Sequence, residues 1–194
     1  IECDVSDYSN VQSVFKEIID KWGRIDVLFN NAGIGNPANT IDLISKKDWD
    51  NLININLNGS FYCAKEAFHY MKSQSPKGGR IINNGSISAH VPRPGSAPYT
   101  VSKHAITGLT KSISLDGRKY NIICSQIDIG NAGTEMTKKM SKGIIQASGD
   151  IVREPVINVD HIAKAVYDIA ELPLNTNIQF MTIMASSMPF IGRG

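Results

Sequence analysis

The pair best suited to proton transfer in this sequence is Tyr99 and Lys103, which lie four residues apart. On a helix such positions share a face, so the lysine ammonium group would lie near the phenol. At roughly 5 Å and an effective dielectric of about 20 the attraction is about 3 kcal/mol. That equals about two pKa units, enough to make the tyrosine a usable general acid and base. Alone, a Tyr-x-x-x-Lys step on a helix is common and usually marks a surface pair.

A serine thirteen residues before Tyr99 strengthens the catalytic interpretation. Ser86 lies at the end of a strand expected over residues 80–87, which would enter the same edge of the sheet as Tyr99. A hydroxyl there can donate to a substrate carbonyl oxygen and stabilise the charge that develops as hydride arrives. Ser88 is a competing candidate, and a local turn hydrogen bond is the alternative role for a serine at a strand end.

The elements that must position these residues follow from the apolar periodicity. Helical spacing is seen between Asp7 and Gly23 and over residues 45–72, 97–119 and 160–172. Short apolar runs predict a strand that ends near Val5 and strands over 25–29, 80–87, 122–129 and 178–184, whereas 130–156 is irregular with weak helix signals. This alternation predicts one α/β domain over 1–194, with a doubly wound, Rossmann-like parallel sheet in three layers. Ligands bind beyond the carboxyl ends of the strands in such sheets.

Composition narrows the class of protein. A chain of 194 residues with 42% hydrophobic and 20% charged residues can bury the core of one domain. The net charge of +2 gives no reason to expect a nucleic-acid partner, and no apolar run approaches the ~20 residues of a membrane span. Three scattered cysteines indicate reduced thiols in a cytoplasmic protein. The four histidines form no ligand motif, so no metal is expected.

Four motifs occur together in the order and spacing of the short-chain dehydrogenase/reductase family, which the sequence resembles from residue 4 to about residue 190. They are Asn30-Asn31-Ala32-Gly33, Asn56 within Asn56-Leu57-Asn58-Gly59, Ser86, and Tyr99-x-x-x-Lys103. The resemblance implies an NAD- or NADP-dependent oxidoreductase that moves hydride between the nicotinamide and a secondary alcohol or ketone. Two alternatives remain open: a 3-oxoacyl-thioester reductase and a catalytically silent, cofactor-binding regulator.

The resemblance also implies a role for each matched position. Tyr99 is the general acid and base, Ser86 polarises the substrate oxygen, and Lys103 tunes Tyr99. Asn56 completes the catalytic set by holding a water next to Lys103. Asp4 and Val5 border the adenine, and Asn30, Ala32 and Gly33 lie against its ribose. The full set of implied cofactor contacts is Asp4, Val5, Asn30, Ala32, Gly33, Tyr99, Lys103, Ile129, Gly130, Ala132 and Thr134.

Two departures from the family pattern affect the cofactor site. The family usually has Pro-Gly where this chain has Ile129-Gly130, so the turn lacks the rigidity of proline. The glycine-rich loop that cradles the pyrophosphate at a helix N-terminus is missing, together with the first strand–helix–strand unit of about 30 residues. We expect this unit to precede Ile1 in the natural protein.

The remaining expectations concern substrate and subunits. Residues 131–156 are expected to form a lid over a small alcohol or carbonyl substrate and to order when ligands bind. Within this segment Met136, Met140, Ile144 and Ile145 either line an apolar pocket or belong to the core. The resemblance further implies a homodimer or homotetramer that packs the helices near 45–72 and 97–119 against their copies. The apolar tail at 188–191 would suit burial in a partner subunit.

Overall fold

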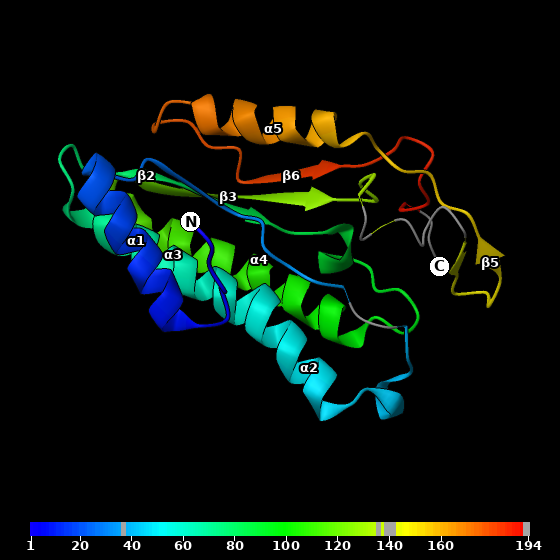
Figure 1. Ribbon diagram of the computed structural model, residues 1–194. Helices are drawn as coiled ribbons and strands as arrows, with labels where there is room; N and C mark the ends of the chain where they lie inside the picture. The colour runs from blue at the N-terminus through cyan, green and yellow to red at the C-terminus, as the bar shows by residue number, and fades with distance from the viewer. Residues whose placement is uncertain (36–37, 135–136, 138–142, 192–194) are drawn as a thin grey trace.

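A four-stranded parallel sheet forms the middle of the molecule (Figure 1). The computed structural model describes residues 1–35, 38–134, 137 and 143–191. The strands are ordered β1-β2-β3-β6, with bounds of Val27–Asn30 for β1, Gly79–Asn84 for β2, Ile122–Ile129 for β3 and Phe180–Ile183 for β6. Helices α1 (Tyr8–Trp22), α3 (Ser60–Ser73) and α4 (Ala97–Gly117) cover one face, and α5 (Val159–Glu171) covers the other (Figure 1). The predicted three-layer α/β fold is therefore confirmed.

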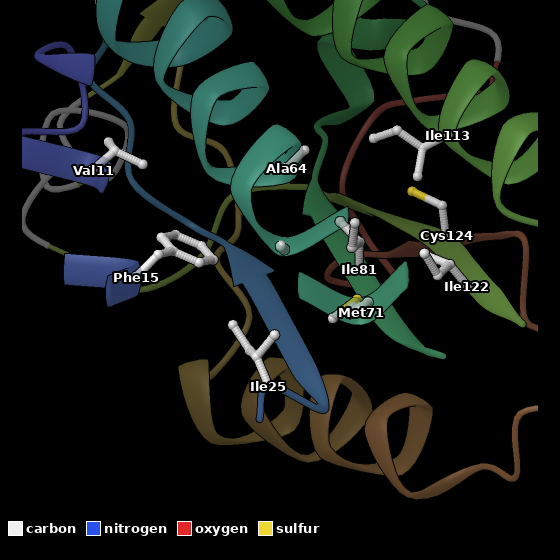
Figure 2. Close-up of a cluster of buried hydrophobic side chains, with 10 residues drawn as sticks. Val11, Phe15, Ile25, Ala64, Met71, Ile81, Ile113, Ile122 and Cys124 are labelled. Carbon is white, nitrogen blue, oxygen red and sulfur yellow. The ribbon is translucent and has the colours of Figure 1, made fainter. Parts of the chain in front are cut away.

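Alternate residues of β2 and β3 face the two helical layers, as the pleat of a strand requires. Ile81 and Cys124 belong to a buried cluster with residues of α1, α3 and α4, which Figure 2 shows. On the opposite face of the sheet, Ile82 of β2 and Ile127 of β3 pack against α5. Both faces of these central strands are buried, and the buried positions include polar residues such as Arg80, Asn83 and Gln126 as well as isoleucines.

The first helix has the bounds that its end residues predict. Asp7 caps its N-terminus by accepting hydrogen bonds from the backbone N–H groups of Ser9 and Asn10. Gly23 ends the helix in the left-handed region, with φ 74°. The strand predicted to end near Val5 is absent, because residues 1–4 pair with none of the described strands.

The long helix predicted over 45–72 is interrupted. Helix α2 (Lys46–Ile53) leads into a six-residue π-helical segment, η2 (Asn54–Gly59), and then into α3. A Cβ atom on Gly59 would lie 2.7 Å from Cγ2 of Val5, so glycine permits the N-terminal segment to cross closely there. Apolar periodicity carried no sign of this segment, although π-helical turns often occur at functional sites.

The region between β3 and α5 differs from its prediction. In place of weak helix, the described part contains an antiparallel hairpin of β4 (Ile144–Ile145) and β5 (Ile151–Val152). Gly149, with φ 91°, allows its turn, which a backbone hydrogen bond from Gln146 to Asp150 closes. Met136 and Met140 lie outside the described residues.

The C-terminal tail folds onto its own chain. Met188 is buried, and its sulfur lies near Gly130, whereas Ile191 is exposed. Burial of the tail at 188–191 in a partner subunit stays a prediction, although Met188 is already buried within this chain. Within the described ranges the structure contains no helix long and apolar enough to cross a membrane.

Candidate active site

Polar side chains gather at the carboxyl ends of the parallel strands, as this fold predicts. Asn30 ends β1, Ser86 follows β2 by two residues, and Asp128 lies at the end of β3. Helix α4 begins at Ala97 and carries Tyr99 in its first turn. Between β2 and α4 the chain forms a short 3-10 turn, η3 (Ile87–Ala89).

Three hydrogen bonds hold Ser86 in place. Its N–H donates to Oδ1 of Asp128 at 3.1 Å, and its carbonyl oxygen accepts from the N–H of Ala89 at 2.8 Å. Its Oγ accepts from the N–H of Ser88 at 3.1 Å. The hydroxyl hydrogen of Ser86 is then available to donate to another oxygen. Ser88, the competing candidate, contributes its backbone to this arrangement.

Tyr99 and Ser86 are brought together by the fold. Burial raises the pKa of Tyr99, while a hydrogen bond with Ser86 and the positive charge of Arg93 partly lower it. The net pKa lies above the ordinary value, because removing a phenolate from water outweighs these two partners. The expectation from the sequence, that the charge of Lys103 brings this pKa down toward neutrality, is wrong for the structure: the pKa is raised, and Lys103 is not among the causes of the shift.

Lys103 has a different partner. Its Nζ lies 5.5 Å from the centre of the Tyr99 ring and donates a hydrogen bond of 2.7 Å to the carbonyl oxygen of Asn84. Burial lowers the pKa of Lys103 to about 8, and the charge of Asp128 opposes that shift. The amine therefore changes charge close to physiological pH, which is the range in which a proton relay is useful.

Asn56 occupies the π-helical segment and is buried. Its Oδ1 accepts from the N–H of Ile34 at 2.8 Å, and its Nδ2 donates to the carbonyl oxygen of Ile34 at 2.9 Å. Its own carbonyl oxygen accepts from Oγ of Ser60 at 2.9 Å. The side chain thus fixes the turn that follows β1, and the predicted role of Asn56 in holding a water stays a prediction.

The cofactor-contact candidates near β1 form two groups. Asn30 is buried, and its Nδ2 donates to Oδ1 of Asn83 at 2.9 Å and to the carbonyl oxygen of Ser60 at 3.1 Å, so it ties β1 to β2 and α3. Ala32 is exposed, and Gly33 lies beside Asn56. Asp4 is exposed and caps a turn by accepting from the N–H of Ser6 at 2.9 Å, and Val5 packs against Gly59.

The candidates after β3 lie on one stretch of chain. Ile129 is the last residue of β3, and a Cβ atom on Gly130 would lie 2.6 Å from Cβ of Met184. Ala132 forms an isolated parallel bridge with Ile157. Thr134 is exposed, and its N–H donates to Oγ1 of Thr137 at 3.0 Å. The structure thus leaves the Thr134 hydroxyl at the surface beyond β3.

Two contacts between a basic and an acidic side chain, which the sequence did not reveal, flank Ser86 and Tyr99. Nε2 of His90 lies 2.7 Å from Oδ2 of Asp128, whose side chain is 1% exposed. Nη2 of Arg93 lies 2.6 Å from Oε2 of Glu154, which is also 1% exposed. Asp128 is the one charged residue of β3, and this charge was the one sign in the sequence that a polar partner lies nearby. His90 and Arg93 carried none, because their partners are remote in the sequence.

The donor set fits a nicotinamide nucleotide. Lys103 has three N–H donors, and the described residues account for one of them, at Asn84. Nη1 of Arg93 is buried and has no hydrogen-bond partner within the described ranges. Lysine donors near the Tyr99 ring suit the ribose hydroxyls of such a cofactor. By contrast, the described residues contain no cluster of His, Cys, Asp and Glu that could hold a metal ion.

Comparison with known proteins decides the family. The short chain dehydrogenase family matches residues 1–144. The chain belongs to this family. It is 35% identical over 154 residues to a 3beta-hydroxysteroid dehydrogenase of Mediterraneibacter gnavus, a match that covers 79% of this chain and 55% of that protein. It is 34% identical over 141 residues to a 3-oxoacyl-acyl-carrier-protein reductase of Staphylococcus aureus, covering 73% of this chain and 56% of that protein.

A solved short-chain dehydrogenase shares the fold. The 3-ketoacyl-(acyl-carrier-protein) reductase of Brucella melitensis complexed with NADH superposes with a TM-score of 0.83 at 20% identity, covering 96% of this chain and 77% of that one. The chain spans about half the length of the curated relatives it matches.

Proposed function

We propose that this chain is the catalytic part of an NAD(P)(H)-dependent oxidoreductase that interconverts a secondary alcohol and a ketone. The observation that carries the proposal is the nearness of Ser86 to Tyr99: the Ser86 side chain acts to lower the pKa of the buried phenol, although the two residues come from different elements. Lys103 lies on the same helix with its ammonium group 5.5 Å from the tyrosine ring. Family membership supports this interpretation of the three side chains.

The cofactor supplies the hydride acceptor or donor when it is bound. Ser86 donates its hydroxyl hydrogen to the substrate oxygen and stabilises negative charge there. Tyr99 gives a proton to that oxygen during reduction and takes it back during oxidation. Lys103 holds ribose hydroxyls with the N–H donors that Asn84 does not use, and its own pKa of about 8 lets it exchange a proton near physiological pH. Asn56 holds the turn after β1 in place beside this site through its two hydrogen bonds to Ile34.

The cofactor contacts proposed for the chain are the positions that match the family. They are Asp4, Val5, Asn30, Ala32, Gly33, Tyr99, Lys103, Ile129, Gly130, Ala132 and Thr134, with either NAD or NADP as the cofactor. β1 forms one edge of the sheet, with β2 as its partner among the described strands. We propose that a strand–helix–strand unit preceding Ile1 pairs with this edge and supplies the phosphate-binding loop, since an exposed edge strand invites pairing.

Lid, subunits and location complete the proposal. We propose that residues 131–156, of which the structure describes 131–134, 137 and 143–156, belong to a lid within a single domain. The Arg93–Glu154 pair ties the described part to the loop before Tyr99. A groove between α3 and α4 contains the exposed side chains of Phe61 and Leu115, which supports packing of these helices against a second copy as a homodimer or homotetramer. The scattered, reduced cysteines support a cytoplasmic location.

A 3-oxoacyl-thioester reductase is the second candidate, favoured by the 34% identical reductase of Staphylococcus aureus. Activity on a carrier-linked 3-oxoacyl chain that exceeds activity on small free ketones would favour it. A silent regulator has less support, because a protein that only binds cofactor has no use for Ser86 and Tyr99 in contact.

The test is Tyr99→Phe in the protein together with whatever sequence precedes Ile1. Turnover of a panel of small ketones is expected to fall by roughly 10²–10⁴-fold, because the acid and base is lost. Cofactor affinity, measured by fluorescence titration, is expected to stay within about twofold, since few binding contacts change. The matched control is Tyr167→Phe, an exposed tyrosine on α5. Wild-type turnover in Tyr99→Phe would refute the proposed function.

A further inference from the structure

Ser86 depends on a residue outside its own turn. Two of its three hydrogen bonds come from Ser88 and Ala89, which belong to the same short turn. The third runs from the N–H of Ser86 to Oδ1 of Asp128 on β3, forty-two residues away in the sequence. Asp128 therefore ties the Ser86 turn to the central sheet.

Asp128 is itself held from two sides. Nε2 of Gln126 donates to Oδ1 at 2.7 Å, and Nε2 of His90 lies 2.7 Å from Oδ2. A carboxylate only accepts, so the Nε2 atom of His90 carries the hydrogen of this bond. A Cβ atom on Gly85 would lie 2.0 Å from Oδ1, which shows how closely the carboxylate sits over the strand end before Ser86.

His90 makes a second contact between the Ser86 turn and Asp128. It ends η3, and its N–H donates to the carbonyl oxygen of Ile87, so the imidazole projects from the turn that Ser86 begins. Its side chain is 44% exposed, whereas that of Asp128 is 1% exposed. The ring of Phe190 meets the imidazole edge-on, with ring centres 6.1 Å apart. The turn is thus fastened to Asp128 at its first residue and again just past its end.

We propose that Asp128 and His90 form a positioning pair that holds the Ser86 turn against β3 and so aims the Ser86 hydroxyl at the reacting oxygen. Neither residue touches that oxygen in this role. The inference rests on the proposed function, because the orientation of the Ser86 hydroxyl affects turnover only if Ser86 polarises the substrate. Burial makes the arrangement rigid, because a buried carboxylate that lost its partners would be left with unmet hydrogen-bonding capacity.

Kinetics of coupled variants test the proposal in the protein with whatever sequence precedes Ile1. The probe is reduction of ethyl 3-oxobutanoate by NADH or NADPH at about pH 6.5, where Lys103, with a pKa of about 8, is mostly protonated. Asp128→Ala is expected to lower kcat by roughly 10- to 100-fold with little change in the KM for cofactor, because a small misplacement of a reacting group has effects of that size. Asp128→Asn is expected to restore most of the loss, because its amide oxygen still accepts from Ser86 while its amide nitrogen faces the other tautomer of His90.

The decisive comparison is between the effect of Asp128→Ala on kcat in the wild type and its effect in a protein that already carries Ser86→Ala. If Asp128 acts through Ser86, then Asp128→Ala has no further effect on kcat once Ser86 is alanine, to within about twofold. His90→Phe, which changes a half-exposed side chain and spares the buried carboxylate, is expected to lower kcat by roughly 3- to 10-fold in the wild type and not at all beside Ser86→Ala. His104→Gln is the matched control, since His104 faces solvent on α4 and bonds to the carbonyl oxygen of Thr100.

A second readout needs no turnover. Amide hydrogen exchange at Ser86 in the cofactor-free protein is expected to be at least about tenfold faster in Asp128→Ala than in wild type and close to wild type in Asp128→Asn, since exchange reports local opening. Equal exchange in all three proteins, or a kcat loss that carries undiminished into the Ser86→Ala background, would overturn the positioning pair. If Ser86→Ala alone leaves turnover intact, the proposed function of Ser86 fails, whatever the exchange data show for the pair.

Discussion

The ammonium group of Lys103 donates a hydrogen bond of 2.7 Å to the backbone carbonyl of Asn84, the last residue of β2. This bond joins α4 to the sheet beside the candidate active site and places a positive charge in the interior, with only 6% of Lys103 exposed. Removing that charge from water is the main reason why the pKa of Lys103 falls from its ordinary 10.5 to about 8.

This shift predicts how stability depends on pH. Below about pH 8 the lysine is protonated in both states, so the folded protein bears the whole cost of burying the charge. Between about 8 and 10.5 the unfolded chain still holds the proton and the folded protein does not, so stability rises with pH. The resulting gain is fully present above 10.5, is lost as pH falls through about 8, and amounts to at most about 3 kcal/mol.

The measurement is urea unfolding of the wild type and of Lys103→Met from pH 7 to pH 10. The free energy of unfolding of the wild type is expected to rise relative to that of the variant across this range. Lys111→Met, which changes an exposed lysine on the same helix, is the control and should show no such trend. A difference between wild type and Lys103→Met that stays constant with pH would contradict the buried, shifted amine.

Asn56 is predicted to stabilise the π-helical segment by its two hydrogen bonds to Ile34. Asn56→Ala leaves both backbone groups of Ile34 without these partners, so we expect a loss of about 2–3 kcal/mol in the free energy of unfolding. Asn58→Ala is the control in the same segment, because its side chain bonds to Asn54 at the surface, and less than about 0.5 kcal/mol should be lost. Urea unfolding that shows equal losses for both variants would contradict this role.

Two glycine substitutions should have opposite effects. A Cβ atom on Gly85 would lie 2.0 Å from Oδ1 of Asp128 and 2.9 Å from Nε2 of Gln126, so Gly85→Ala forces the buried carboxylate to move. We expect it to lower the free energy of unfolding by about 1–3 kcal/mol. Gly108 lies within α4 and has no neighbour within 4 Å of such an atom, so Gly108→Ala should stabilise by about 0.5–1 kcal/mol. Thermal unfolding of both variants checks the sign of each effect.

Local sequence patterns predicted most of the helices and strands, because these depend on neighbours in the chain. Asp7 and Gly23 marked the ends of α1, and apolar periodicity gave the alternation of strands and helices. The step from Tyr99 to Lys103 gave a shared helix face. The π-helical segment was missed, since its altered hydrogen bonding leaves the apolar pattern of 45–72 unchanged.

The electrostatics of the site could not be predicted in the same way, because they depend on burial and on partners remote in the sequence. Asp128 meets His90 across thirty-eight residues, and Glu154 meets Arg93 across sixty-one. Only the assembled sheet edge brings these pairs together. The pKa of Tyr99 could not be predicted for the same reason. Burial decides that this pKa is raised, and the spacing of residues in the sequence does not reveal burial.

Glu154 is predicted to hold the described part of the proposed lid against the loop before Tyr99. Its Oε2 accepts from Nη2 of Arg93 at 2.6 Å and from Nδ2 of Asn131 at 2.7 Å, and its Oε1 accepts from Nε2 of Gln146 at 3.0 Å. Although burial raises the pKa of Glu154, these hydrogen bonds and the charge of Arg93 outweigh burial and lower the pKa below its ordinary 4.5. Its stabilisation is therefore present above about pH 4.5 and is lost as pH falls through the lower, folded value.

Glu154→Gln keeps the shape of the side chain and removes its charge, which takes away the anionic partner that Arg93 has among the described residues. Breaking a buried pair in this way costs about 3–5 kcal/mol. We expect faster amide exchange in the hairpin of β4 and β5 at pH 7, and a difference from wild type that shrinks as the pH is lowered below about 4.5. The control is Asp168→Asn, which breaks the exposed Lys164–Asp168 pair on α5 and should cost less than about 0.5 kcal/mol. Unchanged exchange in the hairpin of Glu154→Gln would show that something other than this carboxylate fastens it.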